Sequence, residues 1–76
     1  MQFAQYDTVR LVGLHKAVDF QPDPLNQRSP RIGDIACIVE VYTNPAGYEL
    51  ECSATNGQTE WLLAFSPSEV ELELVT

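Results

Sequence analysis

Residues 31–42, with the sequence RIGDIACIVEVY, constrain the fold of this chain more than any other stretch. Gly33 and Asp34 are typical turn residues, and the residues after them are rich in β-branched and aromatic types, which favours a strand that begins at a turn. Successive side chains of a strand point to opposite faces. The face predicted to enter the core holds Ile35, Cys37, Val39 and Val41. The second face holds Ala36, Ile38, Glu40 and Tyr42 and is only partly polar, so we expect a central strand.

Four further segments predict strands, namely 7–12, 48–53, 58–65 and 70–74. Three of them alternate between apolar and polar residues, whereas 58–65 is mostly apolar on both faces. Turn signals separate the last four strands: residues 43–47 contain Asn-Pro and Gly, and Asn56-Gly57 is a strong tight-hairpin signal. Residues 66–69, Ser-Pro-Ser-Glu, predict one short helical turn with Ser66 as its N-cap. The inward side chains predicted for these segments are Val9, Leu11, Tyr48, Leu50, Cys52, Trp61, Leu63, Phe65, Val70, Leu72 and Leu74.

A long connection, residues 14–32, follows the first strand and contains three prolines, which excludes a central strand or a helix interior. A loop of this length is often functional or mobile, although a packed surface loop is the simpler interpretation. Leu14, Val18, Phe20 and Leu25 are the side chains expected to attach it to the core. At the N-terminus, Phe3 and Tyr6 are expected to cap an open end of the core.

The order of these segments predicts one all-β domain over residues 1–76. Five short strands bury one thin core and hide their edges best by closing on themselves. We therefore predict a small five-stranded SH3-like barrel with a long loop after strand 1 and one short helical turn before the last strand. An OB-type barrel is the alternative, but the sequence offers no helix between the third and fourth strands.

Four stretches carry a resemblance to a known family: Tyr6-Asp7-Thr8-Val9, Gly33-Asp34 leading into residues 38–42, residues 48–51 (Tyr-Glu-Leu-Glu), and Ser68-Glu69-Val70. Together they resemble a bacterial family of uncharacterised small proteins, domain-of-unknown-function family 4926. The loop at residues 14–30 is longer than that family leads one to expect, and Ala36 stands where its members usually have a second glycine. The resemblance implies an SH3-like barrel without assigned catalytic residues. It also implies a partner role in two-gene toxin–antitoxin or immunity-type arrangements.

The charge is distributed unevenly. The net charge is −7, but the first 31 residues carry +1 and the remainder carries −8, with eight acids and no cation after Arg31. Nucleic-acid binding needs cations that displace counterions from phosphates, so this half of the chain opposes it. An acidic surface instead attracts a basic protein and accelerates association with it. The plainer interpretation is that the acids solvate the outer face of a sheet.

The residues that usually carry chemistry are few. His15, Cys37 and Cys52 lack the close spacing of a zinc site, and the four glycines are isolated, so we predict neither metal nor cofactor. The paired glutamates lie on exposed faces with nothing to raise one pKa selectively, which argues against acid–base catalysis. One allowed hairpin register sets Val41 opposite Tyr48, Val39 opposite Leu50, and Cys37 opposite Cys52. That register would permit a disulfide or a redox switch.

Recognition of a protein remains the most favoured role. An outer face with apolar and acidic side chains is a plausible protein-binding surface. The residues predicted to bind a partner are Ile38, Glu40, Tyr42, Glu49, Glu51, Glu60 and Leu62, with Ala36 and Ala64 beside them. We expect a non-enzymatic, acidic interaction module, either an antitoxin or immunity-type partner of a basic enzyme or a self-associating chain. The alternatives are an accessory subunit of a larger complex and a thiol redox protein. With no apolar run long enough for a membrane span and no signal peptide evident, the expected location is the cytoplasm.

Overall fold

A computed structural model describes residues 3–16, 21–24 and 26–75, and it is all-β in these residues, with no helix among them. The strands are β1 (Thr8–Leu14), β2 (Ile35–Thr43), β3 (Ala46–Ser53), β4 (Thr59–Phe65) and β5 (Val70–Leu74). They form one antiparallel sheet in the order β4-β3-β2-β1-β5. The prediction of a small all-β domain built from five strands is thus confirmed.

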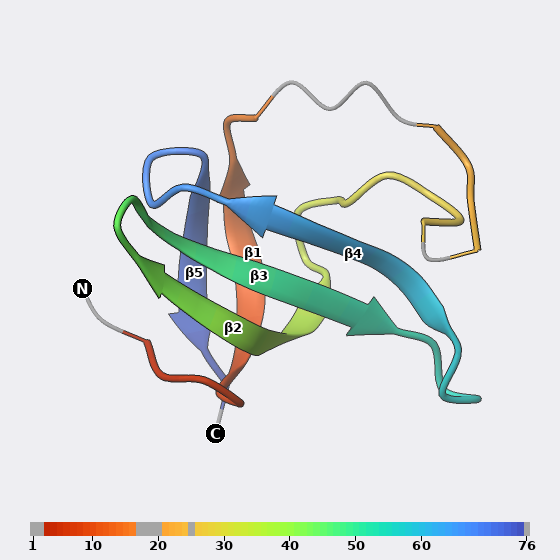
Figure 1. Ribbon diagram of the computed structural model, residues 1–76. Coiled ribbons are helices and arrows are strands. Elements are labelled where there is room, and N and C mark those ends of the chain that lie inside the picture. The colour runs from red at the N-terminus through yellow and green to blue at the C-terminus, as the bar shows by residue number, and fades with distance from the viewer. Residues whose placement is uncertain (1–2, 17–20, 25, 76) are drawn as a thin grey trace.

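The sheet is strongly bent. In Figure 1, β2, β3 and β4 pass in front of β1 and β5 at a steep angle, so one concave face can enclose a core. β4 and β5 are the two edge strands, and no strand ladder between them is seen within the described residues, so closure of the predicted barrel is not observed. All five strands contribute to the core. Its buried members are Val9, Leu11, Ala36, Ile38, Leu50, Cys52, Trp61, Phe65, Val70 and Leu72.

The inward faces of four strands are largely as predicted, but the prediction for the first half of β2 is wrong. Ile38 is fully buried and Ala36 is 3% exposed, whereas Ile35 is 41% exposed. The cause is a β-bulge at Val39: Ile38 pairs with Leu50, and the next pair is Glu40 with Glu49. A shift of one residue moves a strand's side chains to the opposite face. Beyond the bulge, Val41 packs against the core as predicted.

The bulge also decides which residues of the β2–β3 hairpin lie opposite each other. Val41 pairs with Tyr48, which confirms that part of the predicted register. Cys37 pairs with Glu51 rather than with Cys52, and Leu50 pairs with Ile38 rather than with Val39, so the rest of that allowed register is not formed. Directly opposite residues share a face, and Cys52 lies one position beyond Glu51. The two thiols therefore lie on opposite faces of the sheet.

The N-terminal segment closes one side of the core. The ring of Phe3 packs edge-on against Tyr48 with centroids 6.0 Å apart, so Phe3 caps the core as predicted. Tyr6 does not, because its side chain is 73% exposed. Its backbone adopts a φ of 73° and its N–H donates to the carbonyl of Ile38 at 2.6 Å, which attaches this segment to β2.

The connections at the other side differ in detail from the prediction. Residues 66–69 form a hydrogen-bonded turn rather than a helical one: Glu69 N donates to Ser66 O at 3.0 Å, and Ser66 N donates to Glu69 Oε1 at 2.8 Å. β1 continues through Gly13 to Leu14, whose side chain packs against the core. The other side chains expected to attach the long loop, those of Val18, Phe20 and Leu25, lie outside the described residues.

Candidate functional site

The long loop after β1 covers the free edge of β4. Gln27 N donates to the carbonyl of Glu60 at 2.7 Å, and Leu62 N donates to Asn26 Oδ1 at 3.0 Å. Further along the same edge, Lys16 Nζ donates to the carbonyl of Ala64 at 2.9 Å. An exposed strand edge invites pairing with other chains. The loop therefore protects this edge, which favours its interpretation as a packed surface loop for the part that is described.

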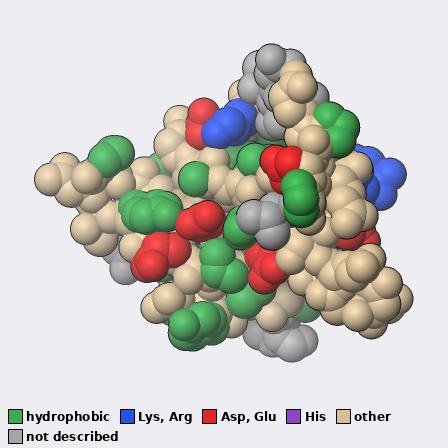
Figure 2. All heavy atoms as spheres, turned by 45° about the vertical axis from the view of Figure 1, so that its right-hand side comes forward, with side chains coloured by type: hydrophobic (Ala, Val, Ile, Leu, Met, Phe, Trp, Pro, Cys, Tyr) green, Lys and Arg blue, Asp and Glu red, His purple; other side chains and the backbone are tan. Residues whose placement is uncertain are grey.

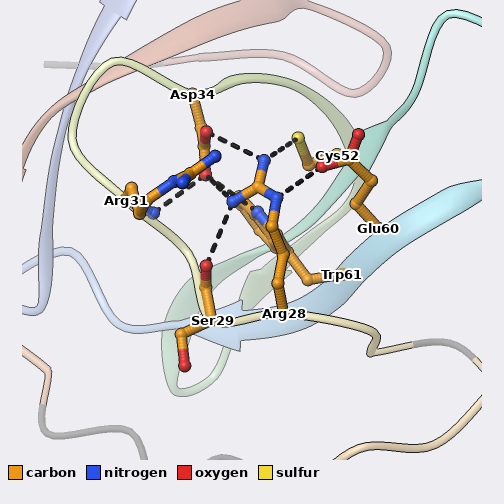
Figure 3. A network of polar contacts seen from close by, with 7 residues as sticks. All are labelled: Arg28, Ser29, Arg31, Asp34, Cys52, Glu60 and Trp61. Atoms are coloured by element: carbon orange, nitrogen blue, oxygen red, sulfur yellow. Dashed lines mark hydrogen bonds and ion pairs between the residues drawn. The ribbon is translucent and has the colours of Figure 1, made fainter.

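Arg28 anchors that loop (Figure 3). Its guanidinium forms a two-point ion pair with Asp34, with Nη1–Oδ2 at 2.9 Å and Nη2–Oδ1 at 3.0 Å, and its Nε donates to Glu60 Oε1. The same Asp34 Oδ2 accepts from the indole Nε1 of Trp61 at 3.0 Å and from Arg31 N at 2.8 Å. Two-point pairs of this kind fix geometry as well as adding energy. The cluster links the loop, β4 and the largest core side chain.

The ionisation of this cluster follows from its contacts. Burial raises the pKa of Asp34, but the hydrogen bonds from Arg28, Arg31 and Trp61 outweigh it, so that pKa lies below its ordinary value. The hydrogen bond to Asp34 raises the pKa of Arg28 further above its already high range. Both groups are therefore charged at neutral pH. The cluster has the character of a structural tie, because the guanidinium of Arg28 is directed at the carboxylates of both Asp34 and Glu60.

Cys52 does not have the surroundings of a reactive thiol. Burial raises the pKa of Cys52, whose side chain sits in the core with Arg28 Nη2 3.6 Å from its sulfur. A reactive thiol needs a lowered pKa and access to solvent. Cys37 lies on the opposite face with its Sγ near its neighbour's carbonyl, and both thiols are free.

The outer face of β2, β3 and β4 brings together most of the residues predicted to bind a partner. Glu40 of β2 lies directly opposite Glu49 of β3, and Glu49 lies opposite Ala64 of β4. One row further along, Glu51 lies between Cys37 and Leu62. The face that Figure 2 presents carries acidic side chains among hydrophobic ones, and basic side chains show toward its top and right-hand edge.

Local hydrogen bonds hold part of this acidic face in place. The hydroxyl of Tyr42 donates to Glu49 Oε1 at 2.7 Å, and Thr59 Oγ1 donates to Glu51 Oε2 at 2.5 Å. The hydrogen bond to Glu49, together with the negative charges of Glu49 and Glu40, raises the pKa of Tyr42. Glu40, Glu49 and Tyr42 are therefore close enough to act on one another. We call Glu40, Tyr42, Glu49 and Glu51 the acidic face.

Three of the four Lys and Arg side chains form ion pairs away from the acidic face. Arg10 pairs with Glu73, Lys16 lies 3.8 Å from Glu69, and Arg28 pairs with Asp34 and Glu60. His15 Nε2 lies 2.5 Å from Glu71 Oε2. Within the described residues, no ion pair involves Glu40, Glu49 or Glu51. The acidic face thus keeps its negative charge uncompensated by a neighbouring side chain.

Two of the predicted binding residues are not available at this face. Ile38 is fully buried in the core because of the bulge at Val39, and its neighbour Ala36 is buried with it. Glu60 is bound to Arg28 through its side chain and to the loop through its carbonyl. The five that remain together are Glu40, Tyr42, Glu49, Glu51 and the half-buried Leu62.

A pocket that sequence reasoning missed adjoins the acidic face. It has a volume of about 570 Å³ and lies between the β2–β3 turn, the end of β4 and the turn at residues 66–69. Tyr42 borders both the pocket and the acidic face. Lys16 also lines the pocket, with its Nζ 5.4 Å from the centroid of the Phe65 ring. The turn residues 43–47 were recognisable in sequence, but their approach to β4 depends on the bend of the sheet.

The comparisons with known proteins leave the family open. No family model, no curated protein and no solved structure matches this chain. The resemblance to family 4926 therefore stays a prediction. Within the described residues, no three His, Cys, Asp or Glu side chains are grouped so as to hold a metal ion. The same part of the chain contains no helix that could cross a lipid bilayer.

Proposed function

We propose that this protein is a non-enzymatic interaction module whose acidic face docks a basic protein. One observation carries the proposal: Glu40 and Glu49 lie directly opposite each other on adjacent strands, and no cation in the described part of the chain forms an ion pair with either. Like charges in that position destabilise a sheet. The lysines or arginines of a partner would remove this repulsion on binding.

The surroundings of these two glutamates support the same role. Tyr42 is 42% exposed and combines a broad apolar ring with a hydroxyl held by Glu49, and tyrosine is enriched at protein interfaces. Ala64 and Leu62 supply apolar surface on the adjoining strand. Apolar surface next to charged side chains gives affinity through the first and a fast, selective encounter through the second.

The biological setting we propose is that of a cytoplasmic antitoxin or immunity-type protein that binds a basic enzyme, as the resemblance to family 4926 and its SH3-like barrel implies. An accessory subunit would use the same face without inhibiting its partner, and inhibition of the partner's activity distinguishes the two. A thiol redox role is less favoured, because Cys37 and Cys52 lie on opposite faces and burial raises the pKa of Cys52.

The proposal is tested by capture with matched baits from a lysate of the source organism. The baits are the wild-type chain, the charge-reversed Glu40→Lys/Glu49→Lys variant, and a control variant Glu71→Lys/Glu73→Lys on β5. Both variants change the net charge equally, but only the first alters the acidic face. We expect a basic protein on the wild-type and control baits and its loss from the acidic-face variant.

Equal recovery of every protein on all three baits would contradict the proposal, because binding would then not depend on this face. Circular dichroism of the baits checks that each is folded. If Glu40→Lys/Glu49→Lys is unfolded, the neutral pair Glu40→Gln/Glu49→Gln replaces it, with Glu71→Gln/Glu73→Gln as its control.

A further inference from the structure

The pocket beside the acidic face is lined by both apolar and polar groups. Apolar surface comes from Val41, Pro45, Ala46, Ala64 and Phe65, and polar groups come from Thr43, Asn44 and Ser66. Its volume of about 570 Å³ lies within the range of about 300–1,000 Å³ that is typical of ligand sites. The pocket therefore has room for a short stretch of peptide side chains and a mainly apolar lining to receive them.

The charge around the pocket is asymmetric. At one side of the pocket, the Tyr42 hydroxyl donates a hydrogen bond to Glu49, and the negative charge of Glu40 also acts on Tyr42. Lys16, which also lines the pocket, donates to the carbonyl of Ala64, and its Nζ lies 3.8 Å from Glu69 Oε1. A ligand that fills the pocket thus meets negative charge beside Tyr42 that no ion pair of the described residues compensates. An apolar ligand without a cation would make no ion pair with those glutamates.

From this juxtaposition we propose that the pocket is an anchor site for an extended, basic peptide segment of the partner, which inserts apolar side chains beside Phe65 and lays lysines or arginines over Glu40 and Glu49. This inference rests on the proposed function and adds the chemistry of the segment that is recognised. Anchor side chains that fill well-packed, desolvated pockets are the usual source of binding energy at interfaces.

The inference is tested by fluorescence anisotropy with a fluorescein-labelled probe peptide that carries two leucines followed by three lysines. One control peptide replaces the leucines with serines, and a second replaces the lysines with glutamines. The pocket is filled by the variant Ala64→Trp, at an exposed strand position that tolerates an aromatic side chain. Val12→Trp, at an exposed position of β1 that does not line the pocket, is its matched control.

We expect Ala64→Trp and Glu40→Gln/Glu49→Gln each to weaken binding of the probe about tenfold or more, and each control peptide to bind as weakly. Val12→Trp and Glu71→Gln should bind like the wild type. If the glutamate variant weakens binding and Ala64→Trp does not, the pocket is not the anchor site and the proposed function stands. If neither variant weakens binding, or the wild type does not bind the probe at about 1 mM, the inference is overturned, while the capture experiment judges the proposed function separately.

Discussion

The guanidinium of Arg28 holds both carboxylate oxygens of Asp34, at 2.9 and 3.0 Å, although the two residues belong to a loop without regular structure. The pair is completed by Trp61, whose indole N–H donates to the same carboxylate. A buried indole needs an acceptor, and a half-buried cation needs a partner. This one arrangement satisfies both and joins the long loop to the core.

The first prediction concerns Arg28. Arg28→Lys keeps the charge but loses the two-point geometry with Asp34 and the simultaneous contact with Glu60. We expect the free energy of unfolding, measured by urea denaturation, to fall by about 1–3 kcal/mol. The control Arg10→Lys affects an exposed pair with Glu73 and should cost less than about 0.5 kcal/mol. Equal costs for the two variants would show that the cluster is not a structural tie.

The second prediction concerns acid stability. Because the pKa of Asp34 is lower in the folded chain than its ordinary value of 3.8, folding favours the ionised carboxylate. Its contribution is complete above that ordinary value and is lost as the pH falls through the folded-state pKa. We expect the unfolding free energy to decline over this range in the wild type and to decline less in Asp34→Asn. Urea denaturation at several pH values, monitored by Trp61 fluorescence, measures the unfolding free energy of both proteins. An equal decline with falling pH in the two proteins would show that the ionised Asp34 does not stabilise the fold.

The third prediction tests the reversed faces of β2. Ile38 is fully buried and Ile35 is 41% exposed, although alternation alone suggested the opposite. Ile38→Ala should lower the unfolding free energy by about 2–5 kcal/mol or prevent folding, because it empties a core site. Ile35→Ala should cost less than about 1 kcal/mol. Thermal denaturation of the two variants decides the point, and a larger loss for Ile35→Ala would place the bulge elsewhere.

The fourth prediction separates stability from binding. Glu40→Gln removes the repulsion between Glu40 and Glu49 while leaving the hydrogen bond from Tyr42 to Glu49 intact. We expect the isolated chain to gain about 0.2–1 kcal/mol in unfolding free energy at low salt, and the gain to shrink as salt is added. Glu71→Gln, whose partner is His15, should give no such gain. A loss of stability in Glu40→Gln would mean that this glutamate serves the fold and not a partner.

The strands were predictable where one face is polar. β3 and β5 alternate cleanly, so the burial of Leu50, Cys52, Val70 and Leu72 follows from sequence. β2 is apolar on both faces, so alternation cannot reveal the bulge at Val39, which depends on how β2 pairs with β3. The error in the predicted binding site has the same origin, because alternation placed Ile38 on the outer face of the sheet.

The Arg28 cluster and the pocket could not be predicted, because both depend on where the long loop and the turns lie relative to β4. A partial signal existed for the cluster. Trp61 was expected to face inward, and a buried indole needs an acceptor, for which Asp34 beside the central strand was a candidate. The acidic face was predictable, because the two strands of one hairpin carry Glu40 and Tyr42 on one strand and Glu49 and Glu51 on the other, all on the outer face.

The central claim is that Glu40 and Glu49 attract a basic partner. It is tested most directly by stopped-flow measurement of the association rate with the partner recovered in the capture experiment, from about 0.02 M to about 0.5 M salt. We expect the wild-type rate to fall steeply with salt. Glu40→Gln/Glu49→Gln should associate about tenfold more slowly at low salt and approach the wild-type rate at high salt. Equal rates for the two proteins, with the same dependence on salt, would contradict the claim.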